Sequence, residues 1–221
     1  MSQKERVNFC RHSHRLILRC NTHSTGPGGT VEKQATNVET ATLAGGCFWG
    51  MEDLIRKQPG VLDTEVGYCG ATSDDPQLST YKHVKTGKTG HAESIQIRFD
   101  SEKTTYADIL DFYFRIHDPT TLNRQGNDIG SQYRSAIFPH DSRQAAIAKF
   151  MIELVNQSGY WPAPAATTIE PYRAFFKAED EHQDYLEHYP TGYTCHFLRR
   201  PASFLDASAR ARLEATLQSA K

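Results

Sequence analysis

The chain has 221 residues and a formal net charge of -1, with 26 acidic and 25 basic side chains. This balance argues against nucleic acid or an anionic membrane surface as the main partner. No apolar run approaches the roughly 20 residues that span a bilayer, so no membrane segment is expected. The five cysteines cannot all pair within the chain. So sparse a set fits a reducing, cytoplasmic compartment and one or two working thiols.

The first segment, residues 1–39, differs in composition from the rest and is predicted to be a flexible extension. Its first thirty residues contain one acid, Glu5, and several basic residues, namely Lys4, Arg6, Arg11, Arg15 and Arg19. An Arg-rich, acid-poor start is also compatible with an organelle (mitochondrial) transit peptide, which is the alternative to a cytoplasmic location. The cysteines and histidines of this segment match no zinc-binding spacing, so no metal site is expected: Cys10, His12, His14, Cys20 and His23.

The stretch Gly45–Gly50, Gly-Gly-Cys-Phe-Trp-Gly, joins a predicted strand end at residues 41–44 to a helix predicted to reach about Gln58. Cys47 is therefore expected at a helix N-terminus, where the dipole and free N–H groups favour a thiolate. The flanking glycines would let another molecule approach the sulfur, and two aromatic rings would wall a pocket. The alternative is a small buried core cysteine.

Glu93 lies in the strand predicted over residues 92–99 and shares the parity of Ile95, Ile97 and Phe99. It therefore points to the core side, where lost hydration raises the pKa of a carboxyl group and keeps it protonated near neutral pH. The alternative is a structural Glu paired with an arginine.

The other predicted elements alternate between strands and helices. In the strand over 61–68, Leu62, Val66 and Tyr68 are expected on the packed face. The polar stretch 120–134 is longer than a connector needs to be and is expected to hold binding groups. The remaining predictions are helices over 104–117, 142–156, 179–188 (with a solvated face) and 206–219, and strands over 135–138 and 167–169.

Several motifs in order give this sequence a resemblance to the peptide methionine sulfoxide reductase A family, from about residue 41 to residue 199. They are Gly45–Gly50, Gly67–Tyr68, Thr80–Tyr81, Gly90–Glu93, His117–Thr120, Asn123–Arg134 and Tyr172–Tyr189. The resemblance implies an α/β (α+β) two-layer sandwich around a mixed sheet with a split βαβ, ferredoxin-like core. Together with the composition of the first segment and the helix predicted near the C-terminus, it divides the chain into the extension 1–39, a catalytic domain 40–200 and a C-terminal helical tail 201–221.

The resemblance also assigns roles to residues of this chain. Cys47 corresponds to the nucleophile, Glu93 to the acid, and Phe48 and Trp49 to the pair that holds the substrate methyl group. The groups that bind or support the departing oxygen correspond to Tyr81, Tyr133 and Asp128. Reducing a sulfoxide requires attack on its sulfur and a proton for its oxygen. A thiol, a protonated acid and hydroxyl donors together supply the groups that this reaction needs.

The attack would leave a sulfenic acid on Cys47, which condenses with a second thiol to a disulfide. Cys195, after a turn in a mobile-looking segment, is the candidate for that resolving thiol, and Cys69 is the alternative. The resemblance implies thioredoxin as reductant, the S epimer of methionine sulfoxide as substrate, free or in oxidised proteins, no cofactor, and a monomer. The competing functions are a thiol peroxidase, which would not need Glu93, and a redox sensor without turnover.

Overall fold

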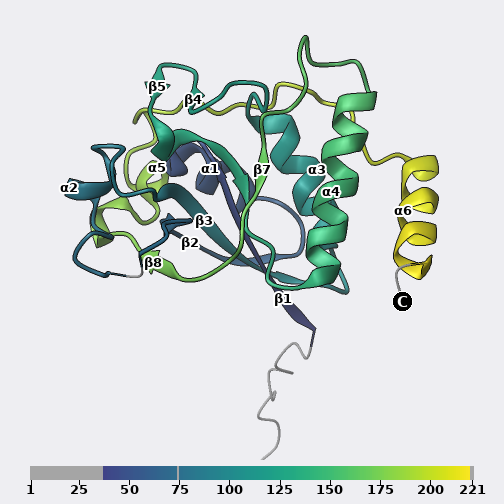
Figure 1. The fold of residues 1–221 in the computed structure, drawn as a ribbon, viewed down its shortest axis with the longest axis horizontal. Helices are drawn as coiled ribbons and strands as arrows, with labels where there is room; N and C mark the ends of the chain where they lie inside the picture. The colour runs from purple at the N-terminus through teal and green to yellow at the C-terminus, as the bar shows by residue number, and fades with distance from the viewer. Residues whose placement is uncertain (1–36, 74, 220–221) are drawn as a thin grey trace, which may run out of the picture. The chain divides into compact units, whose positions relative to one another are not determined.

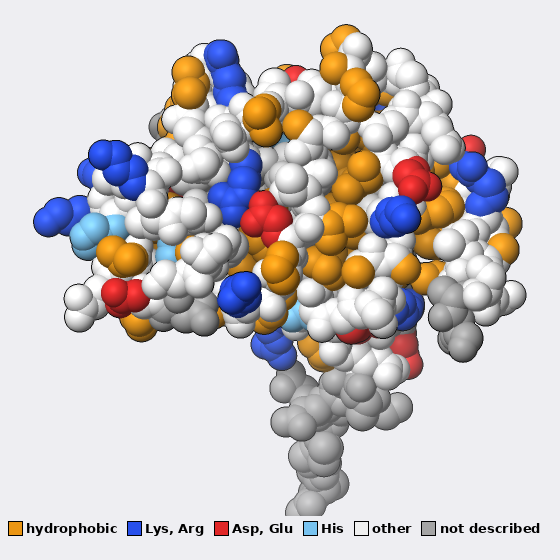
Figure 2. All heavy atoms as spheres, viewed as in Figure 1, with side chains coloured by type: hydrophobic (Ala, Val, Ile, Leu, Met, Phe, Trp, Pro, Cys, Tyr) orange, Lys and Arg blue, Asp and Glu red, His pale blue; other side chains and the backbone are white. Residues whose placement is uncertain are grey.

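The computed structural model describes residues 37–73 and 75–219, and every element below belongs to one compact unit, residues 35–221. The cysteines and histidines of the first segment, including Cys10 and Cys20, lie outside the described residues, as does most of the predicted extension. None of the helices formed by the described residues is long and apolar enough to cross a bilayer. Acidic and basic side chains are both scattered over the face shown in Figure 2.

A mixed six-stranded sheet forms the centre of this unit, in the order β7-β6-β1-β3-β2-β8. Its strands are β1 (Val38–Gly45), β2 (Val61–Cys69), β3 (Ala92–Asp100), β6 (Ser135–Ile137), β7 (Thr168–Ile169) and β8 (Phe175–Lys177). All neighbours pair antiparallel except β6 and β7, which are parallel. The predicted strands over 61–68, 92–99, 135–138 and 167–169 are therefore confirmed.

The core of the sheet has the predicted split βαβ arrangement. The chain runs β1, α1 (Phe48–Ile55), β2, β3, α3 (Tyr106–Ile116) and β6, while these strands lie in the order β6-β1-β3-β2. Strand β3 thus separates β1 from β2, which is the ferredoxin-like order. Helices α1, α3 and α4 (Ser142–Gln157) pack on one face of the sheet around its main apolar cluster (Figure 1). The fold predicted from the family resemblance is confirmed.

The opposite face of the sheet carries a smaller cluster of Ala44, Cys69, Ala92, Ala136 and Phe138. Tyr172 and Phe175, from the chain between β7 and the start of β8, pack against it. Cys69 is fully buried in this cluster. Because alternate residues of a strand point to opposite faces, Tyr68 packs instead with Phe48 of α1.

The predicted helices over 104–117, 142–156 and 206–219 form, and local capping explains two of them. Thr105 and Asp108 make a reciprocal capping box at the start of α3. The Asp141 side chain accepts the N–H of Gln144 at the start of α4. Helix α6 (Ala207–Ser219) packs on α4 near the C-terminal end (Figure 1).

Two local predictions are wrong for tertiary reasons. Leu62 is 47% exposed because a bulge between Val61 and Asp63 shifts the register of β2 against β3. The helix expected over 179–188 is broken into η2 (Asp180–His182) and α5 (Tyr185–His188). Asp184, between them, has a φ of +54° and donates its N–H to Glu52 Oε2 of α1 at 2.9 Å. A contact with α1 therefore outweighs the local helical preference.

The polar stretch 120–134 folds into short elements rather than an irregular loop. A two-stranded ribbon of β4 (Arg124–Gln125) and β5 (Asp128–Ile129) is followed by the 3-10 turn η1 (Ser131–Tyr133). A further short helix, α2 (Tyr81–Val84), lies between β2 and β3 in the chain. These segments carry three of the predicted site residues, Tyr81, Asp128 and Tyr133.

Candidate active site

Cys47 occupies the predicted turn between strand and helix. Strand β1 ends at Gly45 and helix α1 begins at Phe48, so Cys47 is the N-cap residue, with a non-helical φ of -55° and ψ of 122°. Its side chain does not cap the helix. The thiol is 6% exposed and therefore faces the interior rather than bulk water.

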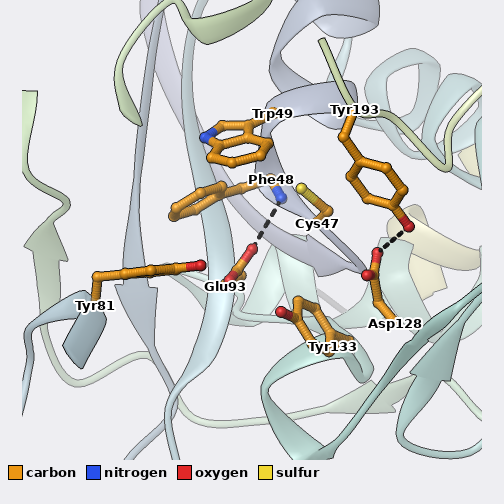
Figure 3. A pocket seen from close by; sticks show the side chains of 8 residues that line it. All are labelled: Cys47, Phe48, Trp49, Tyr81, Glu93, Asp128, Tyr133 and Tyr193. Carbon is orange, nitrogen blue, oxygen red and sulfur yellow. Dashed lines mark hydrogen bonds between the residues drawn. The ribbon is translucent and has the colours of Figure 1, made fainter. Parts of the chain in front are cut away.

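The thiol opens into a cavity of about 140 Å³ whose wall gathers the predicted residues from distant parts of the chain (Figure 3). The lining residues are Cys47, Phe48, Trp49, Tyr81, Glu93, Asp128, Tyr133 and Tyr193. Cavities that hold drug-sized ligands measure about 300–1,000 Å³. This one is therefore sized for the end of a side chain, and its wall combines aromatic rings with acidic and hydroxyl groups.

Glu93 lies on the core side of β3, as its parity predicts, and is 2% exposed. Its Oε2 accepts the backbone N–H of Phe48 at 3.2 Å. Burial raises the pKa of Glu93 to about 8, and the nearby Asp128 carboxylate acts in the same direction. No ion pair among the described residues involves Glu93. The arginine-paired alternative is therefore wrong, and the carboxyl group is mostly protonated at neutral pH.

The predicted preference of Cys47 for the thiolate is wrong for this closed pocket. Burial raises the pKa of the Cys47 thiol well above its ordinary value, and the Glu93 carboxyl group acts in the same direction. The backbone N–H of Trp49 lowers the pKa, as expected at a helix N-terminus, but burial outweighs it. Cys47 and Glu93 are thus both neutral at rest, which avoids two adjacent anions.

Two tyrosines reach the cavity from opposite sides, Tyr81 from α2 and Tyr133 from η1 (Figure 3). The N–H of Tyr81 is held by Glu179 Oε1 at 2.9 Å. Burial first, and then the Glu93 carboxyl group, raise the pKa of both phenols. Both therefore keep their protons at neutral pH and can donate to an oxygen in the pocket.

Cys195 does not line the cavity but lies beside it. It is half-buried, and Cys47, Cys69 and Cys195 are all free thiols. The pKa of Cys195 is raised to about 12, mainly by burial and next by the negative charge of the Asp128 carboxylate. The backbone N–H of Cys47 acts in the opposite direction and lowers the pKa. Cys69, the alternative, is buried in the cluster on the opposite face of the sheet, and burial raises its pKa to about 12.

Comparison with known proteins identifies the family. The model described as "Peptide methionine sulfoxide reductase" matches residues 39–212. The chain is 57% identical over 159 residues to peptide methionine sulfoxide reductase MsrA of Mycolicibacterium gilvum (strain PYR-GCK), covering 72% of this chain and 90% of that protein. Two structures of Mxr1 from Saccharomyces cerevisiae also match. The reduced form has a TM-score of 0.69 at 40% identity and covers 77% of this chain and 97% of Mxr1. The structure of Mxr1 in complex with Trx2 has a TM-score of 0.50 at 28% identity. That match covers 77% of this chain and 96% of the matched chain.

The chain belongs to the peptide methionine sulfoxide reductase A family. The resemblance drawn from its motifs is thereby confirmed. Among the described residues of this family member, no cluster of three or more His, Cys, Asp or Glu side chains could hold a metal ion.

Two glycines of the hexapeptide, Gly46 and Gly50, make room for other segments of this reductase, including the one that carries Cys195. A Cβ atom on Gly50 would overlap Thr194 Oγ1 and lie 2.8 Å from His196 Nδ1. Gly46, at a φ of +110°, is packed just as closely against Gln125. The turn around Cys47 is therefore closed by protein on the side of these glycines.

Sequence reasoning missed Tyr193, which lines the pocket of this reductase, and two residues that pack against its aromatic wall, Tyr185 and His182. The Tyr193 hydroxyl donates to Asp128 Oδ2 at 3.0 Å (Figure 3). Tyr185 stacks on Trp49 with ring centroids 3.8 Å apart, and His182 lies 5.7 Å from Trp49 and 4.5 Å from Tyr81. The aromatic character of Tyr185 was the available signal, but a polar run predicts a solvated helix face, and the break at Asp184 brings the Tyr185 ring onto Trp49.

An ionic network behind the pocket, buried at Glu52 and exposed at Glu187, fixes that break. Arg56 of α1 contacts Glu52 Oε1 at 3.3 Å, Glu187 at 2.7 Å, and Asp184. Glu52 is 1% exposed, and burial raises its pKa to about 7, although Arg56 opposes the shift. The network joins α1, which carries Trp49, to α5, which carries Tyr185. It thereby holds the two stacked rings together.

Proposed function

We propose that this chain reduces the S epimer of methionine sulfoxide, free or in oxidised proteins, to methionine, with thioredoxin as the final reductant. The observation that carries the proposal is the cavity that joins the Cys47 thiol to a protonated Glu93 and an aromatic wall. A thioether-like methyl group packs well on aromatic rings, and Phe48 and Trp49 offer such rings beside the thiol.

In the proposed reaction, the Cys47 sulfur attacks the sulfoxide sulfur, and the oxygen moves from substrate to enzyme. The sulfoxide is reduced to the thioether while Cys47 is oxidised to a sulfenic acid. Charge develops on the oxygen during the transfer, and Glu93 supplies a proton to it, while the thiol proton of Cys47 passes to the Glu93 carboxylate, so that Glu93 ends the step protonated. Because Glu93 Oε2 accepts the N–H of Phe48, the other carboxyl oxygen is the one free to carry that proton. Tyr81 and Tyr133 donate hydrogen bonds to the same oxygen.

The second half of the cycle restores the thiol. The Cys195 thiol condenses with the sulfenic acid to give a Cys47–Cys195 disulfide and water. A dithiol partner then reduces the disulfide by exchange. The structure of Mxr1 in complex with Trx2 supports thioredoxin for this step. Since the electrons come from thiols, the reaction needs no metal or organic cofactor. A monomer in a reducing, cytoplasmic compartment is consistent with this scheme.

A turnover assay tests the proposal. Resolved S and R epimers of a methionine sulfoxide peptide are offered to wild type, Cys47→Ser, Glu93→Ala and Cys195→Ser, with thioredoxin or dithiothreitol as reductant. We expect reduction of the S epimer only, no activity in Cys47→Ser, and a Cys195→Ser enzyme that works with dithiothreitol but not with thioredoxin. Cys69→Ser is the matched control and should keep both activities. A wild type that reduces neither epimer would rule out the proposed function.

A further inference from the structure

The imidazole of His196 lies between the turn that holds Cys47 and the thiol of Cys195. The side chain is buried, with 4% exposed. Its Nε2 atom is 2.8 Å from the carbonyl oxygen of Gly45, and its Nδ1 atom is 3.5 Å from Cys195 Sγ. One ring thus contacts both the strand end that leads into the nucleophile and the second cysteine.

The contact with Gly45 decides which ring nitrogen carries the proton. A carbonyl oxygen can only accept a hydrogen bond, so Nε2 carries the hydrogen. Burial lowers the pKa of His196 to about 4, and Arg199 acts in the same direction. The ring is therefore neutral at physiological pH, and Nδ1 presents a lone pair to Cys195. The charged and titratable groups that face this ring are Arg199, His117 and Cys195.

The Cys195 thiol needs a proton acceptor in order to react. Only the thiolate is an effective nucleophile, and the pKa of Cys195 is raised to about 12. Almost none of the Cys195 thiol is therefore ionised at neutral pH. Its backbone is held in place by Arg199, whose Nη2 donates to the Cys195 carbonyl at 3.2 Å. The thiol is therefore positioned but protonated, with an unprotonated nitrogen in contact.

We propose that His196 is the general base of the disulfide-forming step and takes the thiol proton of Cys195 as its sulfur attacks the oxidised Cys47. This inference rests on the proposed function, in which Cys195 resolves the sulfenic acid. An S–S bond forms and the S–O bond of Cys47 breaks. Cys195 is oxidised, the sulfenic sulfur is reduced, and the oxygen leaves as water. The proton on Nδ1 passes to that oxygen or to solvent, and the imidazole becomes neutral again.

The surroundings of the ring favour this role in two ways. Proton transfer creates an imidazolium and a thiolate in direct contact, and each charge stabilises the other. The glycines beside Cys47 also leave just enough room for the ring, since a Cβ on Gly46 would lie 3.2 Å from His196 Cε1 and one on Gly50 2.8 Å from Nδ1. Asp128 is the rival acceptor, because its carboxylate also accepts a hydrogen bond from the Cys195 thiol, while its Oδ2 accepts the Tyr193 hydroxyl.

A single-turnover experiment separates the two steps. The reduced enzyme is mixed with an equivalent of S-sulfoxide peptide without reductant, from about pH 5 to about pH 8. Methionine release reports the attack by Cys47, and loss of the Cys195 thiol to alkylation reports disulfide formation. His196→Gln keeps an N–H for the Gly45 carbonyl but lacks the basic nitrogen. His196→Asn is the second variant in case His196→Gln does not fold, and Thr194→Val is the matched control in the same segment.

We expect His196→Gln to release methionine at the wild-type rate and to form the disulfide about 10²–10⁴-fold more slowly at neutral pH. Its disulfide rate should rise roughly tenfold per pH unit, because bulk hydroxide must remove the thiol proton. Wild type and Thr194→Val should show a flat profile, since neutral His196 is available throughout this range. A purely structural role for His196 would slow the step without this change in pH profile.

Three results would overturn the inference. His196→Gln and His196→Asn could keep the flat wild-type profile, or Asp128→Asn could acquire the steep profile while His196→Gln does not. Wild type could also release methionine without losing the Cys195 thiol, which would remove the resolving role. A wild type that releases no methionine is a different failure, because it contradicts the proposed function itself.

Discussion

Replacing Glu93 by glutamine should make this protein more stable and less active, and the gain in stability should depend on pH. Glutamine keeps the carbonyl oxygen that accepts the Phe48 N–H but cannot ionise or donate an acidic proton. Loss of general acid catalysis typically lowers a rate by about 10²–10⁴-fold. We therefore expect Glu93→Gln to lower the rate of the first methionine release by this factor.

The size of the stability effect follows from the pKa of Glu93, which is about 8 in the folded chain against an ordinary value of 4.5. Below the ordinary value, the group is protonated in both states and has no effect. Between the two values, the unfolded chain releases the proton while the folded chain retains it. The free energy of unfolding therefore falls by roughly 1.4 kcal/mol per pH unit. By neutral pH the loss amounts to about 3 kcal/mol, and above the folded pKa it stays constant.

Urea unfolding of wild type and Glu93→Gln at several pH values from about 5 to about 8 measures this difference. The advantage of the glutamine variant should grow as pH rises. An amide N–H left without a partner would subtract about 1–3 kcal/mol, but equally at every pH. Glu153→Gln on the exposed side of α4 is the control and should run parallel to wild type. Parallel curves for Glu93→Gln would mean that Glu93 is ionised in the folded protein, and the acid role would be refuted.

The remaining predictions concern the contacts around the pocket. Gly50→Ala places a Cβ atom against Thr194 and His196. It should therefore slow thioredoxin-linked turnover at least tenfold but leave the rate of the first methionine release unchanged. Equal slowing of both steps would contradict the packing argument. Arg56→Ala removes the cation that opposes the raised pKa of Glu52. Because buried Glu52 can then take up a proton instead of keeping an unpaired charge, the free energy of unfolding should fall by about 1–2 kcal/mol near pH 8, as measured in urea. A loss below about 1 kcal/mol would mean that water reaches Glu52.

The sequence alone determines those features that depend on near neighbours in the chain. The apolar run, the glycines and the helical spacing after Cys47 predict a strand, a turn and a helix, and all three form. Strand parity puts Glu93 on the buried side because successive side chains alternate between the two faces. The motif order identifies the family, and the fold follows from it.

Only the tertiary structure decides those features that depend on contacts between distant segments. The pKa of Cys47 is set by how completely distant elements bury it, so its helix position alone predicts the wrong direction. The inward turn of Tyr185 requires the left-handed Asp184, which is held by Glu52 about 130 residues away in the chain. The lone pair of His196 faces Cys195 because the Gly45 carbonyl occupies the other ring nitrogen. Local periodicity carries no information on such contacts, since each joins groups that become neighbours only when the chain folds.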